Sequence, residues 1–196
     1  MPVDRDRIER AVREMLVAIG EDPDREGLRR TPARVADSYA EFFAGLTQDP
    51  LSHLEGSVAI SNNADGTPGT SEAVILRDIA FRSVCEHHLL PFVGVAHVAY
   101  LPNERVIGLS RIPQVIDTLS ARPQLQERLA EEIADTLVAG LEPRGVLVVL
   151  DAVHRCVIAR GSQQAESSTV TVVSRGLLTD PLARSELMGL IGASHV

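Results

Sequence analysis

The sequence predicts a single α+β domain in which a largely antiparallel sheet is backed by two helices and preceded by an N-terminal helical pair. Two observations point to the elements. Apolar residues recur at helical spacing near the N-terminus and again in the middle of the chain, and stretches rich in β-branched residues lie between and after these helices. A third is their order, which is two helices, two strands, two helices, two strands and one helix, and this order is typical of an α+β architecture.

The chain divides into three parts, a helical N-terminal region, a polar loop and a main domain, which are residues 1–55, 56–72 and 73–196. The first helix has an apolar stripe formed by Ile8, Val12, Met15 and Ile19. Gly20 and Pro23 end this helix, and Thr31 followed by Pro32 offers the N-cap and the first position of the second helix. We expect the pair to pack on the core or on a neighbouring subunit.

In the main domain, residues 73–82 and 93–101 are predicted strands because they are apolar and β-branched. Ser110 offers a cap for a helix, which Pro123 interrupts. A longer helix follows, with apolar residues at every fourth position, namely Leu125, Leu129, Ile133, Leu137 and Leu141. The remaining elements are predicted to be two strands and a terminal helix, at residues 145–160, 168–174 and 181–190.

The composition is ordinary for a globular protein, with 44% hydrophobic and 23% charged residues. A formal net charge of −8 argues against a general binder of nucleic acids or anionic membranes, because such binders need a basic face. Two cysteines make no disulfide framework and favour a metal or catalytic role in a reducing compartment. The charged N-terminus is not typical of a secretory signal, and no apolar segment approaches the roughly 20 residues that span a bilayer, so we expect a cytoplasmic protein.

Both cysteines lie beside histidines, in segments 85–88 (CEHH) and 154–156 (HRC). Zinc favours thiolate and imidazole ligands, and catalytic zinc sites keep three protein ligands and one open position. Cys85, His88 and Cys156 would make such a site. Two buried cysteines beside unrelated histidines would give the same pattern, since free cysteines often act as small hydrophobic residues. The C-x-x-H spacing together with the H-x-C segment favours the metal site.

The segment 145–160 adds further groups if it remains a regular strand. Residues two apart in a strand face the same side, so His154, Cys156 and Arg160 would then share one face. That face would offer a metal ligand, a proton-transfer group and an anion-binding guanidinium. His87 and His154 remain outside the ligand set, and histidines titrate in the range suited to proton transfer. A packed, hydrogen-bonded imidazole is the alternative for each.

Four runs of the sequence resemble the GTP cyclohydrolase I family in order and spacing, over about residues 28–190. They are 84–92 (VCEHHLLPF), 106–110 (VIGLS), 122–129 (RPQLQERL) and 154–161 (HRCVIARG). The resemblance implies the tunnelling fold and a ring-stacked homo-oligomer, typically a homodecamer, with active sites at subunit boundaries. Residues 73–196 would then be the catalytic tunnelling-fold domain.

The resemblance also implies a reaction on a guanine nucleotide. A zinc ion (Zn2+), held by the residues that match Cys85, His88 and Cys156, activates the water that attacks C8 of GTP. A second hydrolysis releases formate. The ribose then rearranges and recloses as a pterin, which gives 7,8-dihydroneopterin triphosphate.

Other positions take roles from the resemblance. His87 and His154 match acid–base groups, and Ser110 matches a residue that assists near the sugar. Glu127, with Gln126 beside it, matches the residue that grips guanine, where a carboxylate accepts paired hydrogen bonds from the ring N–H and the exocyclic amine. Without the resemblance, this pair would be a solvated patch at a helix start, where acids are favoured. The basic residues that match phosphate contacts are Arg160, Arg111 and Arg34.

Some phosphate-binding positions depart from the family pattern. Arg111 stands where lysine is usual, Gln114 replaces a customary arginine, and Asp37 replaces a customary lysine. Because a polyphosphate is held mainly by charge-assisted hydrogen bonds, these changes weaken the case for tight triphosphate binding. We expect GTP as the substrate, and a paralogue acting on a less phosphorylated or modified guanine nucleotide is the alternative.

Two other kinds of protein match parts of the pattern. A catalytically inactive, zinc-stabilised oligomeric scaffold would need the ligands but not His87, His154 and Glu127, which are all present. A zinc deaminase would need H-x-E followed by P-C-x-x-C, and this chain has no C-x-x-C. The sequence therefore favours the cyclohydrolase.

Overall fold

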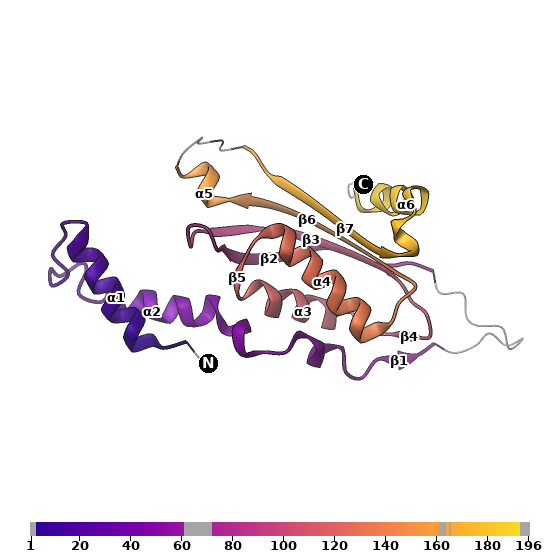
Figure 1. The fold of residues 1–196 in the computed structure, drawn as a ribbon, viewed down its shortest axis with the longest axis horizontal. Helices are drawn as coiled ribbons and strands as arrows, with labels where there is room; N and C mark the ends of the chain where they lie inside the picture. Colours follow the sequence, from indigo (N-terminus) through magenta and orange to yellow (C-terminus); the bar gives the residue numbers. More distant parts are fainter. Residues whose placement is uncertain (1–2, 61–71, 161–163, 165, 193–196) are drawn as a thin grey trace, which may run out of the picture.

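The computed structural model describes residues 3–60, 72–160, 164 and 166–192, and it has the predicted α+β architecture (Figure 1). The α-helices are α1 (Arg5–Ala18), α2 (Thr31–Phe42), α3 (Arg111–Ser120), α4 (Gln126–Leu141), α5 (Arg155–Ile158) and α6 (Pro181–Gly192). The strands are β1 (Val58–Ala59), β2 (Val74–Cys85), β3 (Pro91–Leu101), β4 (Arg105–Val106), β5 (Pro123–Gln124), β6 (Gly145–His154) and β7 (Thr169–Gly176). The described part of the chain also contains the short 3-10 helices η1 (Ala44–Thr47), η2 (Pro50–Leu54) and η3 (Leu177–Thr179).

The main sheet has five strands in the order β5-β2-β3-β6-β7. Strands β2, β3, β6 and β7 form antiparallel pairs in that order, whereas the short β5 runs parallel to the end of β2. Strands β1 and β4 form a separate antiparallel pair. The register places Phe92 opposite His154 and Cys85 opposite Gln124. One end of the sheet therefore gathers the last residues of β2 and β6, the first of β3, and β5.

The helices α3 and α4 cover one face of the main sheet, and α6 lies on the other face (Figure 1). The predicted apolar stripe of α4 is confirmed, since Leu129, Ile133 and Leu137 have no exposed surface. Alternate residues of β6 serve the two faces, as the period of a strand requires. Val148 belongs to the core with α3 and α4, and Leu147 belongs to the smaller core beside α6.

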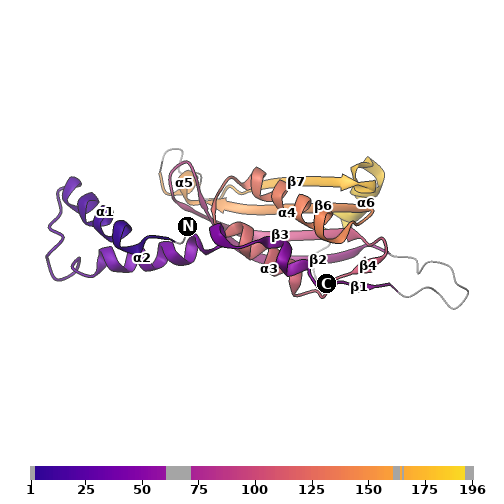
Figure 2. The same cartoon turned by 60° about the horizontal axis from the view of Figure 1, so that its bottom comes forward.

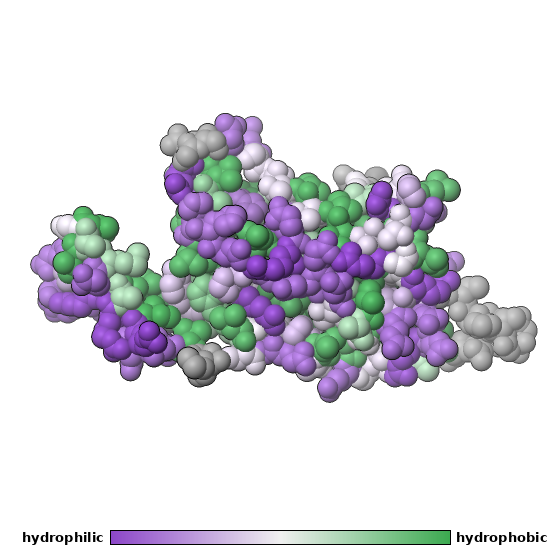
Figure 3. Space-filling view, in the orientation of Figure 1, coloured by the Kyte–Doolittle hydropathy of each residue, from purple (hydrophilic) through white to green (hydrophobic). Residues whose placement is uncertain are grey.

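The N-terminal helices α1 and α2 pack against each other and project away from the sheet (Figure 2). No residue of α1 is buried, and Met15 and Ile19 are 64% and 74% exposed. Figure 3 shows apolar surface on this projecting pair as well as on the main domain. An ion pair between Arg5 and Asp37 ties the two helices together. Within a single chain, the pair therefore does not pack on the core.

The predicted strand 145–160 is wrong at its end, because β6 ends at His154 and the next residues form the short helix α5. The partner strand explains this end. β3 begins at Pro91, which lacks a backbone N–H and would stand opposite Arg155, so the ladder has no further donor there. As a result, Cys156 and Arg160 do not share a strand face with His154.

Two predicted helix caps also differ from the structure. Thr31 is the first residue of α2 rather than its N-cap, and Pro32 follows inside the first turn. Ser110 occupies the N-cap position of α3, but its side chain makes no capping hydrogen bond. Both helices begin within a residue of the expected place, so these differences leave the fold unchanged.

Residues 61–71, which make up most of the predicted polar loop, lie outside the described residues. The part of the loop that the structure describes contains β1, which pairs with β4. None of the helices in the described part of the chain combines the length and apolarity that crossing a bilayer requires.

Candidate active site

The histidine pair of the predicted site lies on the tight turn between β2 and β3. The backbone N–H of Cys85 donates to the carbonyl of Leu90 (2.9 Å), and that of Leu89 donates to the carbonyl of Cys85 (2.9 Å). Leu89 has a φ of 52°, a left-handed conformation that leucine rarely adopts and that is often found at functional sites. This turn leaves His87 and His88 exposed, with their ring centroids 6.3 Å apart.

The two thiols lie next to each other. Cys85 is 4% exposed at the end of β2, and Cys156 is half-buried in α5. Burial raises the pKa of the Cys156 thiol, and the charge of Cys85 and a side-chain hydrogen bond with it raise that pKa further. The guanidinium of Arg160 acts in the opposite direction, so it also lies near this thiol. The fold thus brings together two cysteines that are far apart in the sequence.

The thiol pair fits only part of the expected zinc site. Zinc in a catalytic site takes three protein ligands. Among the described residues, no three or more His, Cys, Asp or Glu side chains are arranged to hold a metal ion. Cys85 and Cys156 therefore provide two adjacent donors, and the exposed imidazole of His88 does not complete the set in this arrangement.

His154, at the end of β6, has a fixed orientation. Its ring stacks on Phe92 of β3, with the centroids 4.7 Å apart and the planes within 3°. Its Nε2 lies 2.7 Å from Oε1 of Gln126. Burial lowers the pKa of His154, and the carboxylate charge of Glu127 partly offsets this effect. The ring is therefore held on one face and at one nitrogen, beside a negative charge.

Gln126 sets the hydrogen-bonding role of His154. It is 1% exposed, and its Nε2 donates to the carbonyl oxygens of Leu150 (3.1 Å) and Thr169 (2.7 Å). With both amide protons used, Oε1 can only accept, so Nε2 of His154 is the donor in their hydrogen bond. The neutral imidazole then carries its free lone pair on Nδ1. A solvated patch is the wrong description of Gln126.

Glu127 differs from its neighbour because its side chain is exposed in the first turn of α4. Its charge acts on His154, which places the carboxylate close to that ring. The polar atoms of Gln126 are used within the chain, whereas Glu127 is open to a ligand. Of the two residues expected to bind the base, Glu127 has the exposed side chain and Gln126 the buried one.

The residues expected near the sugar and the phosphates are not all gathered at this place. Ser110 and Arg111 lie at the start of α3, whose other end contacts β2 through the bond from Ser83 Oγ to the carbonyl of Ser120 (2.7 Å). A helix of ten residues is about 15 Å long, so Ser110 and Arg111 lie roughly that far from the thiol end of the sheet. Arg34 is exposed on the projecting α2. The guanidinium of Arg111 donates to Oε1 of Gln114 (3.3 Å), one turn further along the same helix.

A cavity of about 600 Å³ lies elsewhere, along the outer edge of β2. Arg82 and Asp117 are among the residues that line it, and burial raises the pKa of Asp117. Neither thiol and none of the histidines discussed above takes part in its lining. The cavity is therefore separate from the candidate site at the end of the sheet.

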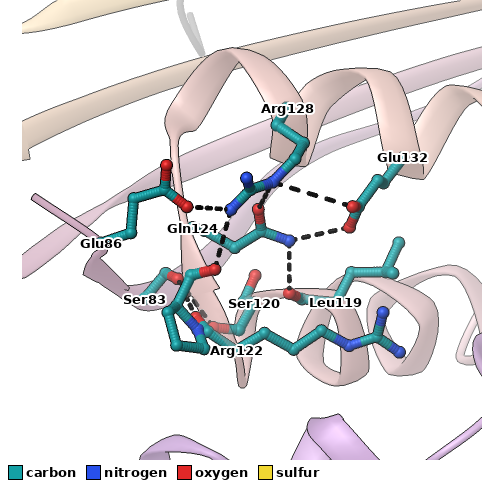
Figure 4. Close-up of polar contacts among 9 residues, drawn as sticks. Ser83, Glu86, Leu119, Ser120, Arg122, Gln124, Arg128 and Glu132 are labelled. Carbon is teal, nitrogen blue, oxygen red and sulfur yellow. Dashed lines mark hydrogen bonds and ion pairs between the residues drawn. The ribbon is translucent and has the colours of Figure 1, made fainter.

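Sequence reasoning missed several side chains that support this site, namely Phe92, Glu86, Gln124, Arg128 and Glu132. Figure 4 shows the polar contacts among the last four of them. Gln124 and Arg128 are four residues apart and flank the predicted base-binding pair. This spacing was the one sequence feature that could have pointed to a contact between them. Nothing in the local pattern shows that Gln124 is 1% exposed or that Arg128 reaches the turn after β2.

An oriented imidazole beside adjacent thiols and an open carboxylate is typical of a centre that moves protons during a reaction. The fold and the site together describe an α+β enzyme. The chain belongs to the GTP cyclohydrolase I family, whose model matches residues 8–192, and it is therefore a hydrolase. The family predicted from the four sequence runs is thus confirmed.

Known proteins match nearly the whole chain. It is 62% identical to GTP cyclohydrolase 1 of Leifsonia xyli subsp. xyli over 189 residues, which cover 96% of each chain. It is 51% identical to GTP cyclohydrolase 1 of Carboxydothermus hydrogenoformans over 192 residues, which cover 97% of this chain and 96% of the relative. Among solved structures, the apo form of the archaeosine synthase QueF-Like aligns with a TM-score of 0.44 and 20% identity, over 53% of this chain and 93% of that one.

Proposed function

We propose that this protein is a zinc-dependent cyclohydrolase that opens the imidazole ring of guanine in GTP, releases formate and forms 7,8-dihydroneopterin triphosphate. Relatives that match nearly the whole chain carry the name GTP cyclohydrolase 1, which supports the substrate. Within the chain, the observation that carries the proposal is the gathering of both thiols, His154 and Glu127 at one end of the sheet. The product would enter pterin and tetrahydrofolate biosynthesis in the cytoplasm.

Cys85, Cys156 and His88 would hold the zinc ion. The adjacent thiols support this ligand set, because zinc prefers thiolate and imidazole ligands. His88 would complete the set when its exposed side chain turns toward them. When bound, zinc lowers the pKa of a water molecule to about 7 and so supplies a nucleophile at neutral pH.

The remaining groups would bind the base and move protons. Glu127 would accept hydrogen bonds from the ring N–H and the exocyclic amine of guanine, and a base without these donors would leave the carboxylate unpaired. His154 would exchange protons at Nδ1, because Gln126 occupies its Nε2. The exposed imidazole of His87 would serve as the second acid–base group.

The active site would be completed by a neighbouring copy of the chain. We propose a ring-stacked homodecamer of tunnelling-fold subunits, with sites at the subunit boundaries. Ser110 and Arg111 lie about a helix length from the thiols, so a second copy would supply these groups to the site. In the described residues, the outer edge of β7 and most of that of β2 have no neighbouring strand, and open edges of this kind favour pairing with another chain.

Subunit complementation tests this arrangement. Cys85→Ala and Arg111→Ala chains are co-expressed and purified together, and their activity is compared with that of each variant alone. If the two residues of one site come from different chains, mixed oligomers contain some intact sites and recover activity. Inactive mixed oligomers would contradict shared sites, and light scattering gives the mass of the assembly.

The number of phosphates on the substrate is a separate question. Asp37 pairs with Arg5, and Gln114 accepts a hydrogen bond from Arg111 (3.3 Å), so both departures from the family pattern are engaged within the chain. Triphosphate contacts would then come from Arg34, Arg111 and Arg160. This arrangement keeps a less phosphorylated guanine nucleotide as the second candidate substrate.

A substrate panel tests the proposed reaction. Purified protein is incubated with GTP, GDP or GMP, and released formate, pterin absorbance and product mass are measured. We expect one formate for each pterin, with GTP turned over fastest. Faster turnover of GMP would assign the protein to the second candidate substrate, and no formate from any of the three would contradict the reaction itself.

A further inference from the structure

Arg128 joins three elements beside the candidate site (Figure 4). It lies in the first turn of α4, directly after Glu127. Its Nη2 donates to Oε2 of Glu86 (2.5 Å), in the turn after β2, and to the carbonyl of Pro123 (2.9 Å) in β5. Its Nε donates to Oε1 of Gln124 at 3.0 Å. Because a guanidinium is planar and rigid, three simultaneous contacts fix both the distance and the direction between these elements.

Gln124 anchors this arrangement. It is 1% exposed, and its Nε2 donates to the carbonyl of Leu119 in α3 (3.1 Å) and to Oε2 of Glu132 in α4 (2.8 Å). With both amide protons used, its Oε1 accepts the bond from Arg128. The backbone N–H of Glu86 also donates to the carbonyl of Gln124 (3.1 Å). The turn after β2 is therefore tied to α3 and α4 through one buried residue, whose backbone carbonyl accepts from the turn and whose side chain donates to the two helices.

The contact between Arg128 and Glu86 acts on geometry more than on stability. The two side chains are 42% and 34% exposed, and ion pairs this exposed contribute little to global stability. The turn that they hold carries His87 and His88, whereas α4 carries Glu127. A misplacement of about 1 Å between reacting groups costs a rate factor on the order of 100.

We propose that Arg128 is a positioning residue for the reaction. Through Glu86, it holds the turn of residues 86–90 at a fixed place relative to the first turn of α4. The histidines of the turn thereby stay in register with the base-binding carboxylate of Glu127. This inference rests on the proposed function of the site, and Arg128 itself does not touch the substrate.

A double-mutant cycle on formate release tests the role. Arg128→Ala and Glu86→Ala are each expected to lower kcat by about 10- to 100-fold, with KM changed by less than about threefold. The kcat of the double variant should be no lower than that of the more impaired single variant, because both substitutions break the same link. Arg128→Lys keeps the charge without the planar fork, so it should recover only part of kcat.

Arg175→Ala is the matched control. Arg175 of β7 pairs with Glu131 and Asp135 of the same helix α4. Among the described residues, the hydrogen bonds and ion pairs of its side chain go to these two residues and to Ser174, and none reaches the turn after β2. We expect this variant to keep kcat within about twofold of the wild type. If the losses of kcat in Arg128→Ala and Glu86→Ala multiplied in the double variant, the two residues would act independently and the proposal would be overturned. A KM for GTP that rises in Arg128→Ala alone would also overturn it, because Arg128 would then bind phosphate directly.

Hydrogen exchange gives a readout that does not depend on turnover. Arg128→Ala should speed amide exchange in residues 86–90, and Arg175→Ala should not. Unchanged exchange in Arg128→Ala would refute the positioning role even in an active enzyme. A wild-type protein that turns over no guanine nucleotide would refute the proposed function, while the exchange result would still report on the link between the turn and α4.

Discussion

The two groups of residues expected to act on the nucleotide differ in how far a single chain assembles them. Both thiols, His154 and Glu127 lie together at one end of the main sheet. Arg34, in contrast, is exposed on the projecting α2, and Arg111 lies at the far end of α3. The difference teaches that the fold of one chain gathers the groups proposed for ring opening, whereas Arg34 and Arg111, proposed as phosphate contacts, lie on elements away from them.

The largest effect should come from breaking the thiol pair. Cys156→Ala is expected to lose bound zinc and to lower formate release to background, because a single thiolate and one imidazole hold zinc poorly. Metal analysis of the purified protein and a formate assay measure both effects. Val157→Ala, in the same short helix, is the control for disturbance of α5. Full metal and full turnover in Cys156→Ala would show that the ligand assignment is wrong.

Removing the oriented imidazole should affect chemistry and leave the metal in place. His154→Ala is expected to keep zinc and to lower kcat by about 100-fold or more, in the range found for lost acid–base groups. His97→Ala is the control, because His97 lies mid-strand, where its Nδ1 accepts from the backbone of Asp78. Loss of zinc in His154→Ala would mean that this residue supports the metal and does not act on protons.

Substitution of Gln126 should have a smaller effect on kcat, and it distinguishes a residue that orients His154 from one that binds the guanine base. Gln126→Leu removes the buried amide that donates to the carbonyls of Leu150 and Thr169, so we expect the free energy of unfolding to fall by about 1–3 kcal/mol. Denaturant titration at fixed protein concentration measures this change. The kcat should fall while KM for the nucleotide stays close to the wild-type value, since Glu127 remains. A rise in KM alone would instead favour direct contact between Gln126 and guanine.

The smallest effect concerns the phosphate side. Gln114→Arg restores a cation beside Arg111 and is expected to lower KM for GTP by about fivefold, which corresponds to about 1 kcal/mol at an exposed site. The KM for GMP should change less, since GMP carries fewer phosphate charges. Steady-state kinetics with both nucleotides make the comparison. Equal changes for both would contradict the view that this position faces the distal phosphates.

The sequence was informative where local pattern decides structure. The four-residue spacing of Leu129, Ile133 and Leu137 predicts a buried helix face, and all three are fully buried in α4. The placement of residues 85–88 between two β-branched stretches predicts a turn at a strand end, and the turn is there. The two thiols meet because β2 ends at Cys85 and β6 ends two residues before Cys156, both at the same end of the sheet.

Features that depend on distant contacts could not be read from the sequence. The strand β5 is two residues long, which is too short for any periodic signal. The end of β6 depends on Pro91 in the partner strand, and the burial of Gln126 depends on carbonyls of β6 and β7. The pairing of Asp37 with Arg5 joins two helices through exposed charges, for which the sequence offers many equivalent partners.

X-ray absorption at the zinc edge of the purified wild-type protein tests the central claim most directly, because it identifies the atoms bound to the metal. The account predicts stoichiometric zinc with two sulfur ligands and one imidazole nitrogen. Zinc without sulfur in its coordination shell, in a protein that still releases formate from GTP, would contradict it.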